Sequence, residues 1–401
     1  MMKNINFEEN EERLLAGTYQ KIPVVAARAE GTRIWDAEGK EYLDFMSGYG
    51  VAILGHSFPA VKEAIRKQLD EVYITHASVY SPARSSFLSE LSSVLPWNSS
   101  RMFLSNSGAE AVEAAIKIAL KYTGRKKFIS MEKAYHGKTI GALSLTHSNK
   151  YRKSFGDIIY PNVEFLKFGD TEQLKKSLQG EDVAAVFLEP VQGEGGINLP
   201  PEEYMKSVRE ITEETGTLLV LDEIQSGLGR TGKMWAHQHW GISPDIMTIG
   251  KGIGGGLPMG VTAGRSDIVE TLEIGEQSST TGGNPLACAA GVAVLKELRN
   301  GYVKRAETQG AYLLNRMREE IGEHRLVASP RGIGMMLAVE LKIRFLPILM
   351  NQIQGGLITL YSGFNTIRLL PPYIITEQDA EAAVGIMKQA LDRQLENSRV
   401  S

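Results

Sequence analysis

The chain of 401 residues contains only one cysteine, Cys288. A single cysteine excludes any disulfide within the chain, so a large apolar core has to hold the fold together. Cys288 lies in the run Leu-Ala-Cys-Ala-Ala, where small apolar residues surround it. We therefore expect it to be a buried side chain rather than a reactive thiol.

Long apolar runs and an excess of one charge are also missing. The net charge of −3 gives no electrostatic reason to expect binding to nucleic acid or to an anionic membrane. No run approaches the roughly 18 apolar residues that a membrane span needs. The N-terminus is acidic and lacks the apolar core of a signal peptide. We expect a soluble, cytoplasmic protein.

Hydrophobic residues make up 43% of the chain, which is ample for a core. Chains longer than roughly 250–300 residues usually divide into domains. Short alternating bursts over residues 22–46 predict a small antiparallel unit. After about residue 295 the pattern changes to a long amphipathic helix followed by short strands. We expect a large domain over residues 47–295, a small α+β domain over 296–401, and an N-terminal segment, 1–46, that packs with the small domain.

The middle of the chain alternates short apolar runs with helix-like stretches. The runs cover residues 101–104, 127–130, 183–188, 217–221 and 246–249. Apolar runs of this kind predict a mostly parallel sheet covered by helices on both faces. Ligands of such α/β sheets bind beyond the carboxyl ends of the strands. The polar residues that follow these runs are therefore the candidate site.

Two charged residues directly follow or end buried runs. Lys251 precedes the glycine-rich stretch Gly252–Gly256, and partial desolvation there lowers a lysine pKa and gives a nucleophilic amine. Viewed alone, it is equally consistent with a solvated loop lysine. Asp222 ends the most apolar run, where a buried carboxylate needs a partner such as a pyridinium, although it also suits a helix N-cap. Gln225, three residues later, is placed to reach the hydroxyl of such a ring.

Two further segments suit a phosphate and an aromatic ring. Ser107, Gly108 and Ala109 lie between a strand and a helix, where free backbone N–H groups and the helix dipole bind anions. Tyr135 follows the next strand and is a candidate to stack on a ring, or is a core aromatic residue.

Two other motifs point elsewhere and are weaker. Residues 227–233 match both the dinucleotide pattern G-x-G-x-x-G and the pattern G-x-x-x-x-G-K. Met234 stands where a P-loop needs Ser or Thr for magnesium, and the glycines begin five residues after Asp222 rather than in the tight turn itself. His237 and His239 lack a third ligand at a suitable spacing. We therefore expect neither a nucleotide site nor a metal site.

Taken together, these residues resemble the class III aminotransferases of pyridoxal-phosphate fold type I, over residues 20–392. The matching stretches are Leu-Asp-Glu-Ile-Gln-Ser-Gly-Leu-Gly-Arg-Thr-Gly (221–232), Pro-Asp-Ile (244–246), Gly-Lys-Gly-Ile-Gly-Gly-Gly (250–256), Asn-Ser-Gly-Ala-Glu-Ala (106–111), Tyr-His-Gly (135–137), Leu-Glu-Pro-Val-Gln-Gly-Glu-Gly (188–195) and Ser-Thr-Thr-Gly-Gly-Asn-Pro (279–285). The resemblance implies an α/β fold, with a mostly parallel sheet in a large domain and a smaller α+β domain built from both termini.

The resemblance also implies a role for each site residue. Lys251 would carry pyridoxal 5′-phosphate as a Schiff base and shuttle protons, and Asp222 would pair with the ring nitrogen. The other cofactor-binding residues would be Ser107, Gly108, Ala109, Tyr135, His136, Gln225 and Thr280. Thr280 would reach the phosphate across a homodimer interface. The substrate-binding residues would be Tyr49, Lys138, Glu189, Glu194, Ser279 and Arg368.

Within this family, the chain is most similar to the acetylornithine and acyl-lysine aminotransferases, including those that act on carrier-protein-linked lysine or ornithine. The resemblance to these enzymes implies transfer of a terminal amino group to 2-oxoglutarate by a ping-pong mechanism. It also implies that Glu194 masks Arg368 when the amine donor enters. Many relatives have arginine where this chain has Lys138, which leaves open a diamine, ornithine or 4-aminobutyrate donor. Racemases and mutases share the scaffold. Thr281 stands where the family usually has an aromatic residue before Gly-Gly-Asn-Pro.

Overall fold

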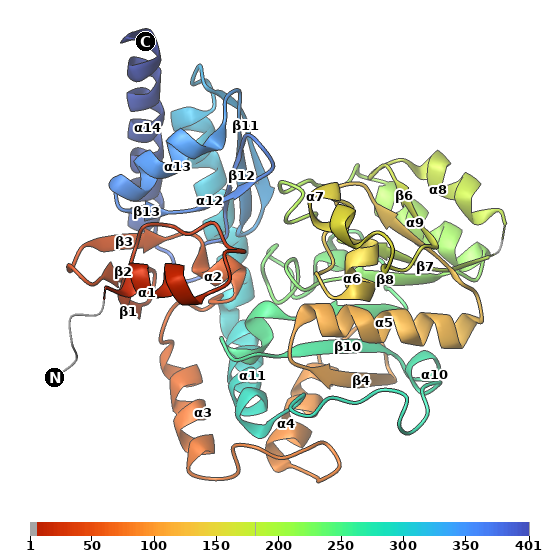
Figure 1. Cartoon of the computed structure of the whole chain (residues 1–401). Coiled ribbons are helices and arrows are strands. Elements are labelled where there is room, and N and C mark those ends of the chain that lie inside the picture. Colours follow the sequence, from red (N-terminus) through yellow and green to blue (C-terminus); the bar gives the residue numbers. More distant parts are fainter. Residues whose placement is uncertain (1–5, 181, 401) are drawn as a thin grey trace.

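A seven-stranded sheet forms the centre of the larger part of the molecule, on the right in Figure 1. This computed structural model describes residues 6–180 and 182–400. The strand order is β4-β10-β9-β8-β7-β5-β6. Strands β5 to β9 pair in parallel, whereas β10 is antiparallel to both of its neighbours. The strands are β4 (Ser100–Ser105), β5 (Lys127–Met131), β6 (Val163–Leu166), β7 (Val183–Leu188), β8 (Leu218–Asp222), β9 (Ile246–Ile249) and β10 (Gly260–Arg265).

The sheet is mostly parallel, as the sequence predicts, and both of its faces are buried. In β8, Leu218 and Val220 join one apolar cluster, whereas Leu219 and Leu221 join the other. This alternation follows from the two-residue period of a strand. Helices α5 (Gly108–Thr123) and α6 (Ile140–Leu145) cover the first face, and α8 (Thr171–Leu178) and α9 (Tyr204–Glu214) cover the second.

The two ends of the chain meet in the other part of the molecule, on the left in Figure 1. One sheet has the order β1-β2-β3-β13, so a C-terminal strand pairs with N-terminal strands. A second sheet has the order β11-β12-β15-β14. The strands are β1 (Ala26–Glu30), β2 (Arg33–Asp36), β3 (Glu41–Asp44), β11 (Val327–Ile333), β12 (Met336–Leu341), β13 (Leu357–Ile358), β14 (Leu360–Ser362) and β15 (Thr366–Leu369). This α+β unit built from both termini is the one expected from the resemblance.

Helices α12 (Val303–Ile321) and α13 (Phe345–Gln354) pack on these sheets, and α14 (Glu377–Val400) packs on α12 and α13. The start of α14 is capped, because Asp379 N donates to Thr376 Oγ1 at 3.1 Å and Thr376 N donates to Asp379 Oδ2 at 3.0 Å. These reciprocal bonds satisfy backbone groups that the helix itself leaves free.

The remaining helices are short or lie below the large sheet in Figure 1. They are α1 (Phe7–Leu14), α2 (Ser47–Gly50), α3 (Pro59–Leu69), α4 (Pro82–Ser92), α7 (Asn149–Arg152), α10 (Ser266–Val269) and α11 (Pro285–Glu297). Helix α11 packs between α3 and α4. It carries Cys288, which is fully buried as predicted, and burial raises the pKa of its thiol to about 12. Among the described residues, no helix is both long enough and apolar enough to span a bilayer.

Two helical glycines provide a test of how α12 packs. A Cβ at Gly310 would collide with the backbone of Gly334, whereas a Cβ at Gly385 in α14 would meet no atom within 4 Å. Alanine favours a helix over glycine by about 1 kcal/mol. We expect Gly385→Ala to raise the free energy of unfolding by about 0.5–1 kcal/mol and Gly310→Ala to lower it. Urea denaturation of the two variants measures both signs, and a stabilising Gly310→Ala would contradict this packing.

Candidate active site

A cavity of about 510 Å³ lies at the carboxyl ends of the parallel strands. Most of the predicted site residues meet in it, together with three that the sequence did not single out, Gly137, Thr139 and Ile224. The predicted residues in its wall are Gly108, Ala109, Tyr135, His136, Lys138, Glu189, Glu194, Asp222, Gln225 and Lys251.

Asp222, the last residue of β8, is buried and held by two hydrogen bonds. Its Oδ2 lies 2.7 Å from His136 Nδ1, and its Oδ1 accepts the N–H of Ile224 at 3.1 Å. Burial alone would lower the pKa of His136, but the hydrogen bond and charge of Asp222 raise it above its ordinary value. The pair therefore fixes a carboxylate at the cavity wall, where it suits the protonated nitrogen of a pyridine ring.

Lys251 directly follows the segment that leads out of β9 and faces the same cavity. Burial lowers the pKa of its amine below the ordinary value, and the carboxylates of Glu194, Asp222 and Glu189 oppose this effect. Its backbone is left-handed, with φ of 51°. A non-glycine residue in this region carries strain that the surrounding structure must offset, and such strain is frequent at active sites. The structure thus favours a reactive amine over a solvated loop lysine.

The N-terminus of α5 forms the end of the cavity that suits an anion. Glu110 N donates to Ser107 Oγ at 3.2 Å, so Ser107 caps the helix and is exposed outside the cavity wall. A Cβ at Gly108 would lie 2.7 Å from Ile224 Cδ1, so only glycine fits there. The first N–H groups of a helix have no partner within it, and Gly108 and Ala109 line the cavity, so this turn can bind a phosphate.

Glu189 and Gln225 complete the cavity floor. Glu189 Oε1 accepts the N–H of Tyr135 at 2.9 Å, and Oε2 accepts the N–H of Gly193 at 3.0 Å. Glu189 therefore holds the backbone next to the predicted stacking residue. Gln225 Oε1 is buried and has no hydrogen-bond partner within the chain. A buried acceptor without a partner indicates a place for a ligand donor such as a ring hydroxyl. The chain's residues thus fit the predicted cofactor.

An ion pair closes the side of the cavity that faces the small domain. Arg368 Nη2 lies 2.7 Å from Glu194 Oε1, and Arg368 Nε donates to Tyr361 O at 3.2 Å. Arg368 is fully buried, and its Nη1 has no partner within the chain. Tyr49 lies close by in a left-handed turn, where burial and the charge of Glu194 raise the pKa of its hydroxyl.

A second cavity of about 910 Å³ continues from the first, because Tyr135 and Glu194 line both. Lys138 Nζ lies 4.7 Å from the ring centre of Tyr151, and the rings of Tyr135 and Tyr151 meet edge to face at 6.0 Å. Tyr151 also lines this outer cavity. The sequence did not identify Tyr151, because no motif surrounds it.

Five predicted residues are not in the wall of the inner cavity. Ser107 caps α5, Arg368 is paired with Glu194, and Tyr49 lies near that pair, whereas Ser279 and Thr280 lie on a separate segment. Thr280 is exposed, and Ser279 Oγ accepts from Asn106 Nδ2 at 3.1 Å and from Gly282 N at 3.0 Å. The role of Thr280 across a dimer interface and the substrate contact of Ser279 remain predictions.

The two weaker motifs have structural roles instead. A Cβ at Gly229 or Gly232 would press on Tyr373 or Glu307, so residues 227–233 pack against the small domain. His237 Nδ1 contacts Ile242 O at 2.6 Å, and His239 Nε2 contacts Thr231 O at 3.1 Å. In the described part of the chain, no three His, Cys, Asp or Glu residues are grouped to hold a metal ion.

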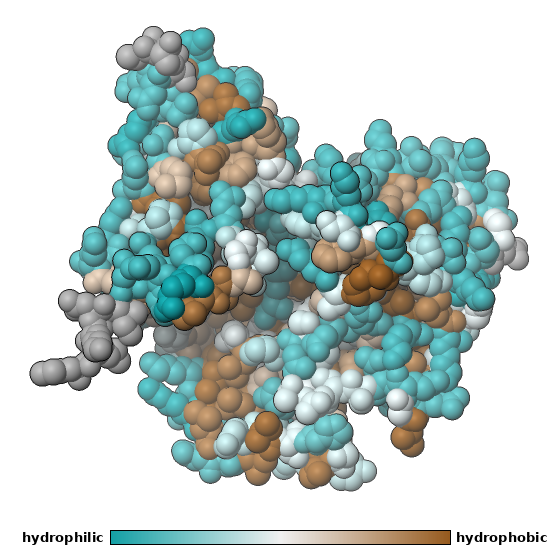
Figure 2. Space-filling view, in the orientation of Figure 1, coloured by the Kyte–Doolittle hydropathy of each residue, from teal (hydrophilic) through white to brown (hydrophobic). Residues whose placement is uncertain are grey.

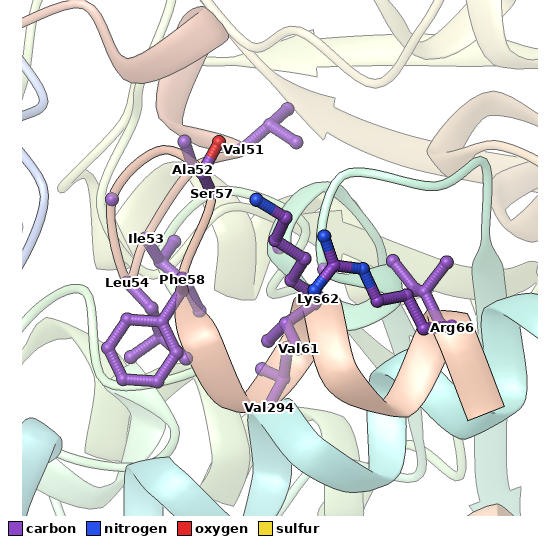
Figure 3. Close-up of a pocket in the computed structure, with 14 residues that line it drawn as sticks. Val51, Ala52, Ile53, Leu54, Ser57, Phe58, Val61, Lys62, Arg66 and Val294 are labelled. Atoms are coloured by element: carbon purple, nitrogen blue, oxygen red, sulfur yellow. The ribbon is translucent and has the colours of Figure 1, made fainter. Parts of the chain in front are cut away.

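A separate apolar cavity of about 280 Å³ lies on the other side of the Lys251 turn. It is lined by Gly252 and Gly255 of that turn, by residues 51–55, 57 and 58, and by Val294. Lys62 and Arg66 extend from α3 along it (Figure 3). None of the predicted cofactor-binding or substrate-binding residues lines it.

Comparisons with known proteins agree with this geometry. The family described as Aminotransferase class-III matches residues 14–391. The chain is 40% identical to LysW-aminoadipate semialdehyde transaminase of Deinococcus radiodurans, over 95% of this chain and 89% of that protein. It is 39% identical to acetylornithine aminotransferase of Caldanaerobacter subterraneus, over 95% and 98%. The ornithine aminotransferase structure from Toxoplasma gondii superposes with a TM-score of 0.93 at 32% identity, over 98% of this chain and 95% of that one.

The environment of Glu189 predicts a pH dependence of stability. Burial raises the pKa of its carboxyl group from about 4.5 to about 7, although His136 opposes the effect. The folded state therefore binds a proton that the unfolded state releases, and its stabilising contribution is complete below pH 4.5 and is lost as pH rises to about 7. Denaturant unfolding of cofactor-free protein should show a loss of about 1–3 kcal/mol from this group.

The variant Glu189→Gln carries no titrating group and should remove this part of the pH dependence. Glu210→Gln, on the exposed side of α9, should retain the wild-type slope. Equal slopes for the wild type and Glu189→Gln between pH 4.5 and 7 would contradict the raised pKa.

Proposed function

The chain belongs to the class III aminotransferases, which depend on pyridoxal phosphate, and from this premise we propose that it moves the terminal amino group of an acylated lysine or ornithine to 2-oxoglutarate. The donor is free or attached to a carrier protein. Relatives over nearly the full length of the chain are named for LysW-linked semialdehydes and for acetylornithine, which supports an acylated donor.

Each part of the cavity has a task toward the cofactor. Bound pyridoxal phosphate supplies an aldehyde carbon that accepts an amine and a protonated ring that withdraws electrons. Asp222, held by His136, would keep the proton at the ring nitrogen. The amine of Lys251, with its lowered pKa, would attach the cofactor and carry a proton to or from the substrate carbon. The N-terminus of α5 would hold the phosphate, and Tyr135 would lie against the ring.

The ion pair between Glu194 and Arg368 is the observation that carries the proposal. An exposed arginine in the cavity would favour a dicarboxylate such as 2-oxoglutarate, because guanidinium grips a carboxylate with two parallel hydrogen bonds. With Glu194 at 2.7 Å, that charge is neutralised and the cavity accepts an uncharged chain. One cavity thus serves two substrates in turn, which is what a ping-pong reaction requires. A racemase or mutase has no need for such an exchange.

The outer cavity gives room for a long donor and for the end of the donor that lies far from the reacting amine. Its volume of about 910 Å³ leaves room for an acylated chain that continues outward, including one attached to a carrier protein. Lys138 lines the inner cavity close to the ring of Tyr151 in the outer one, and it supplies a positive charge for the α-carboxyl end or its amide. Tyr49 lies near Glu194 and Arg368. A lysine binds carboxylate as a point charge, more weakly than the arginine common in relatives.

We infer that the enzyme is a homodimer whose active sites lie at the interface. The resemblance assigns Thr280 to the phosphate of a partner copy, and Thr280 is exposed and outside the cavity of its own chain. Large apolar side chains are exposed on the neighbouring segment at Val72, Tyr73, Ile74, Val79 and Tyr80. Figure 2 shows further apolar surface below, where α3 lies in Figure 1. Exposed apolar patches of this kind mark protein interfaces.

The second candidate function is transfer from ornithine, a diamine or 4-aminobutyrate. It is favoured by Lys138 in place of arginine and by the likeness to ornithine aminotransferase structures. The two candidate functions differ in the amino donor that the enzyme prefers.

The role of Lys251 has a direct spectroscopic test. The purified wild type should be yellow, because the cofactor attached to a lysine absorbs visible light. Lys251→Ala should lose this band and fall by several orders of magnitude in kcat, whereas Lys233→Ala, in the loop that packs on the small domain, should keep both. A persisting band of unchanged position in Lys251→Ala would assign attachment to another lysine.

A donor panel with 2-oxoglutarate tests the substrate class. Acetylornithine, acetyllysine and carrier-linked lysine should exceed ornithine, putrescine and 4-aminobutyrate in kcat/KM by at least tenfold. Higher values for the unacylated diamines would favour the second candidate.

Lys138→Arg asks whether this position binds the α-carboxylate. Because arginine forms the two-pronged contact, the variant should lower KM for acetylornithine several-fold and leave KM for putrescine unchanged. Steady-state kinetics with the two donors measure the difference, and equal changes for both would place Lys138 outside carboxylate recognition.

A further inference from the structure

The loop at residues 227–233 has no place in the chemistry above, yet it contains one of the most buried charges in the molecule. Arg230 is 1% exposed, and no carboxylate of the described residues forms a salt bridge with it. Its guanidinium instead donates to three backbone carbonyls, at 2.6 Å to Pro371 O, 3.2 Å to Met335 O and 3.4 Å to Gly50 O. Burying a charge without a counter-ion is costly, so these contacts need a reason.

The three carbonyls belong to segments that are far apart in the sequence. Gly50 follows Tyr49, and Pro371 follows the strand that carries Arg368. These two segments also touch each other, because Ser47 Oγ donates to Leu370 O at 2.5 Å and Leu370 N donates to Phe45 O at 2.8 Å. Arg230 therefore lies where the turn of Tyr49 and the strand of Arg368 meet.

The rest of the loop fixes Arg230 in this position. Its guanidinium stacks at 4.9 Å on the ring of Tyr373, whose hydroxyl donates to Leu228 O at 2.9 Å. Met335 N donates to Arg230 O at 2.8 Å. A Cβ at Gly334 would lie 2.7 Å from the same carbonyl, so the close approach requires glycine. These contacts come from both the large and the small parts of the molecule.

The turn that Arg230 supports is strained. Ser47 and Tyr49 are non-glycine residues with φ of 44° and 62°, and Gly50 has φ of 83°. A left-handed run of this kind persists only when its surroundings hold it in place. The contact to Gly50 O is one such restraint, and the left-handed φ of Gly50 would strain any other residue at this position.

We propose that Arg230 is a positioning residue that sets Tyr49 and Arg368 relative to each other by joining the carbonyls of Gly50 and Pro371, and so determines how tightly the cavity binds a dicarboxylate. The proposal rests on the proposed function, in which Arg368 binds the second carboxylate of 2-oxoglutarate. Arg230 touches neither the substrate nor the cofactor. Its removal affects binding through geometry and leaves Lys251 and Asp222 in place.

The test uses the cofactor-loaded enzyme and glutarate, a dicarboxylate with no amino or keto group. Calorimetric titration gives its Kd for the wild type, Arg230→Met and Arg230→Lys. Arg125→Met is the matched control, because Arg125 also donates to three backbone carbonyls, those of Val183, Thr215 and Gly216, but lies at the opposite ends of the strands.

We expect Arg230→Met to weaken glutarate binding about tenfold or more and to raise KM for 2-oxoglutarate by a similar factor, with a smaller change in kcat and an unchanged cofactor absorbance. Arg230→Lys, which retains the charge but not the fork, should fall between. Arg125→Met should bind glutarate within twofold of the wild type even where its Tm is lower. Amide hydrogen exchange should accelerate at residues 46–50 and 369–373 in Arg230→Met alone.

A Kd for Arg230→Met within twofold of the wild type overturns the proposal, whatever happens to Tm. If Arg230→Met fails to fold, the Kd of Arg230→Lys for glutarate is used instead, and a value within twofold of the wild type overturns the proposal. Arg368→Lys separates this outcome from failure of the proposed function. If Arg368→Lys leaves glutarate binding unchanged, Arg368 is not the carboxylate ligand, and the proposed function is overturned together with the role of Arg230.

Discussion

The buried carboxylate of Asp222 is the constraint on which the site depends. A charge at the end of a fully apolar strand is tolerated only with partners, and the chain supplies His136 at 2.7 Å on the neighbouring side of the cavity. That contact joins the end of β8 to the segment after β5, and Glu189 at the end of β7 then holds the same segment through Tyr135 N. Three strand ends are thereby fixed relative to one another before any ligand binds.

Much of this site is predictable from the sequence because parallel strands end at one edge. Each apolar run is visible in the sequence, and the residue after it has to lie at that edge, so Lys251 and Asp222 meet although 29 residues separate them. Strand β10 was not predicted because Gly260, Thr262 and Gly264 interrupt any apolar run. Those small residues are required by close neighbours, since a Cβ at Gly264 would press on Val269 and Asp245. The short edge strand β6 contains Glu164 and was missed for a similar reason.

Contacts between the two parts of the molecule have no recognisable pattern in the sequence. Tyr151 carries no motif, and its place beside Lys138 arises only when α7 folds over the outer cavity. Residues 227–233 present a strong pattern, but the pattern alone does not reveal that its glycines serve packing against Tyr373 and Glu307. Gly50, Met335 and Pro371 are distant from Arg230 in the sequence, and no sequence pattern links them to it. Their common feature, a carbonyl directed at one guanidinium, exists only in three dimensions.

The two fully buried arginines near the site illustrate how the partner determines the role of a charge. Arg368 is paired with a carboxylate on a side chain that retains 28% exposure, so the pair can separate when a substrate carboxylate competes for the guanidinium. Arg230 is paired with carbonyls of the main chain, which cannot leave without moving the segments that carry them. In the proposed function, the first arrangement allows Arg368 to exchange Glu194 for a substrate carboxylate. In our proposal for Arg230, the second arrangement keeps Gly50 and Pro371 at a fixed distance, and exchange at Arg368 is selective only while that distance is maintained.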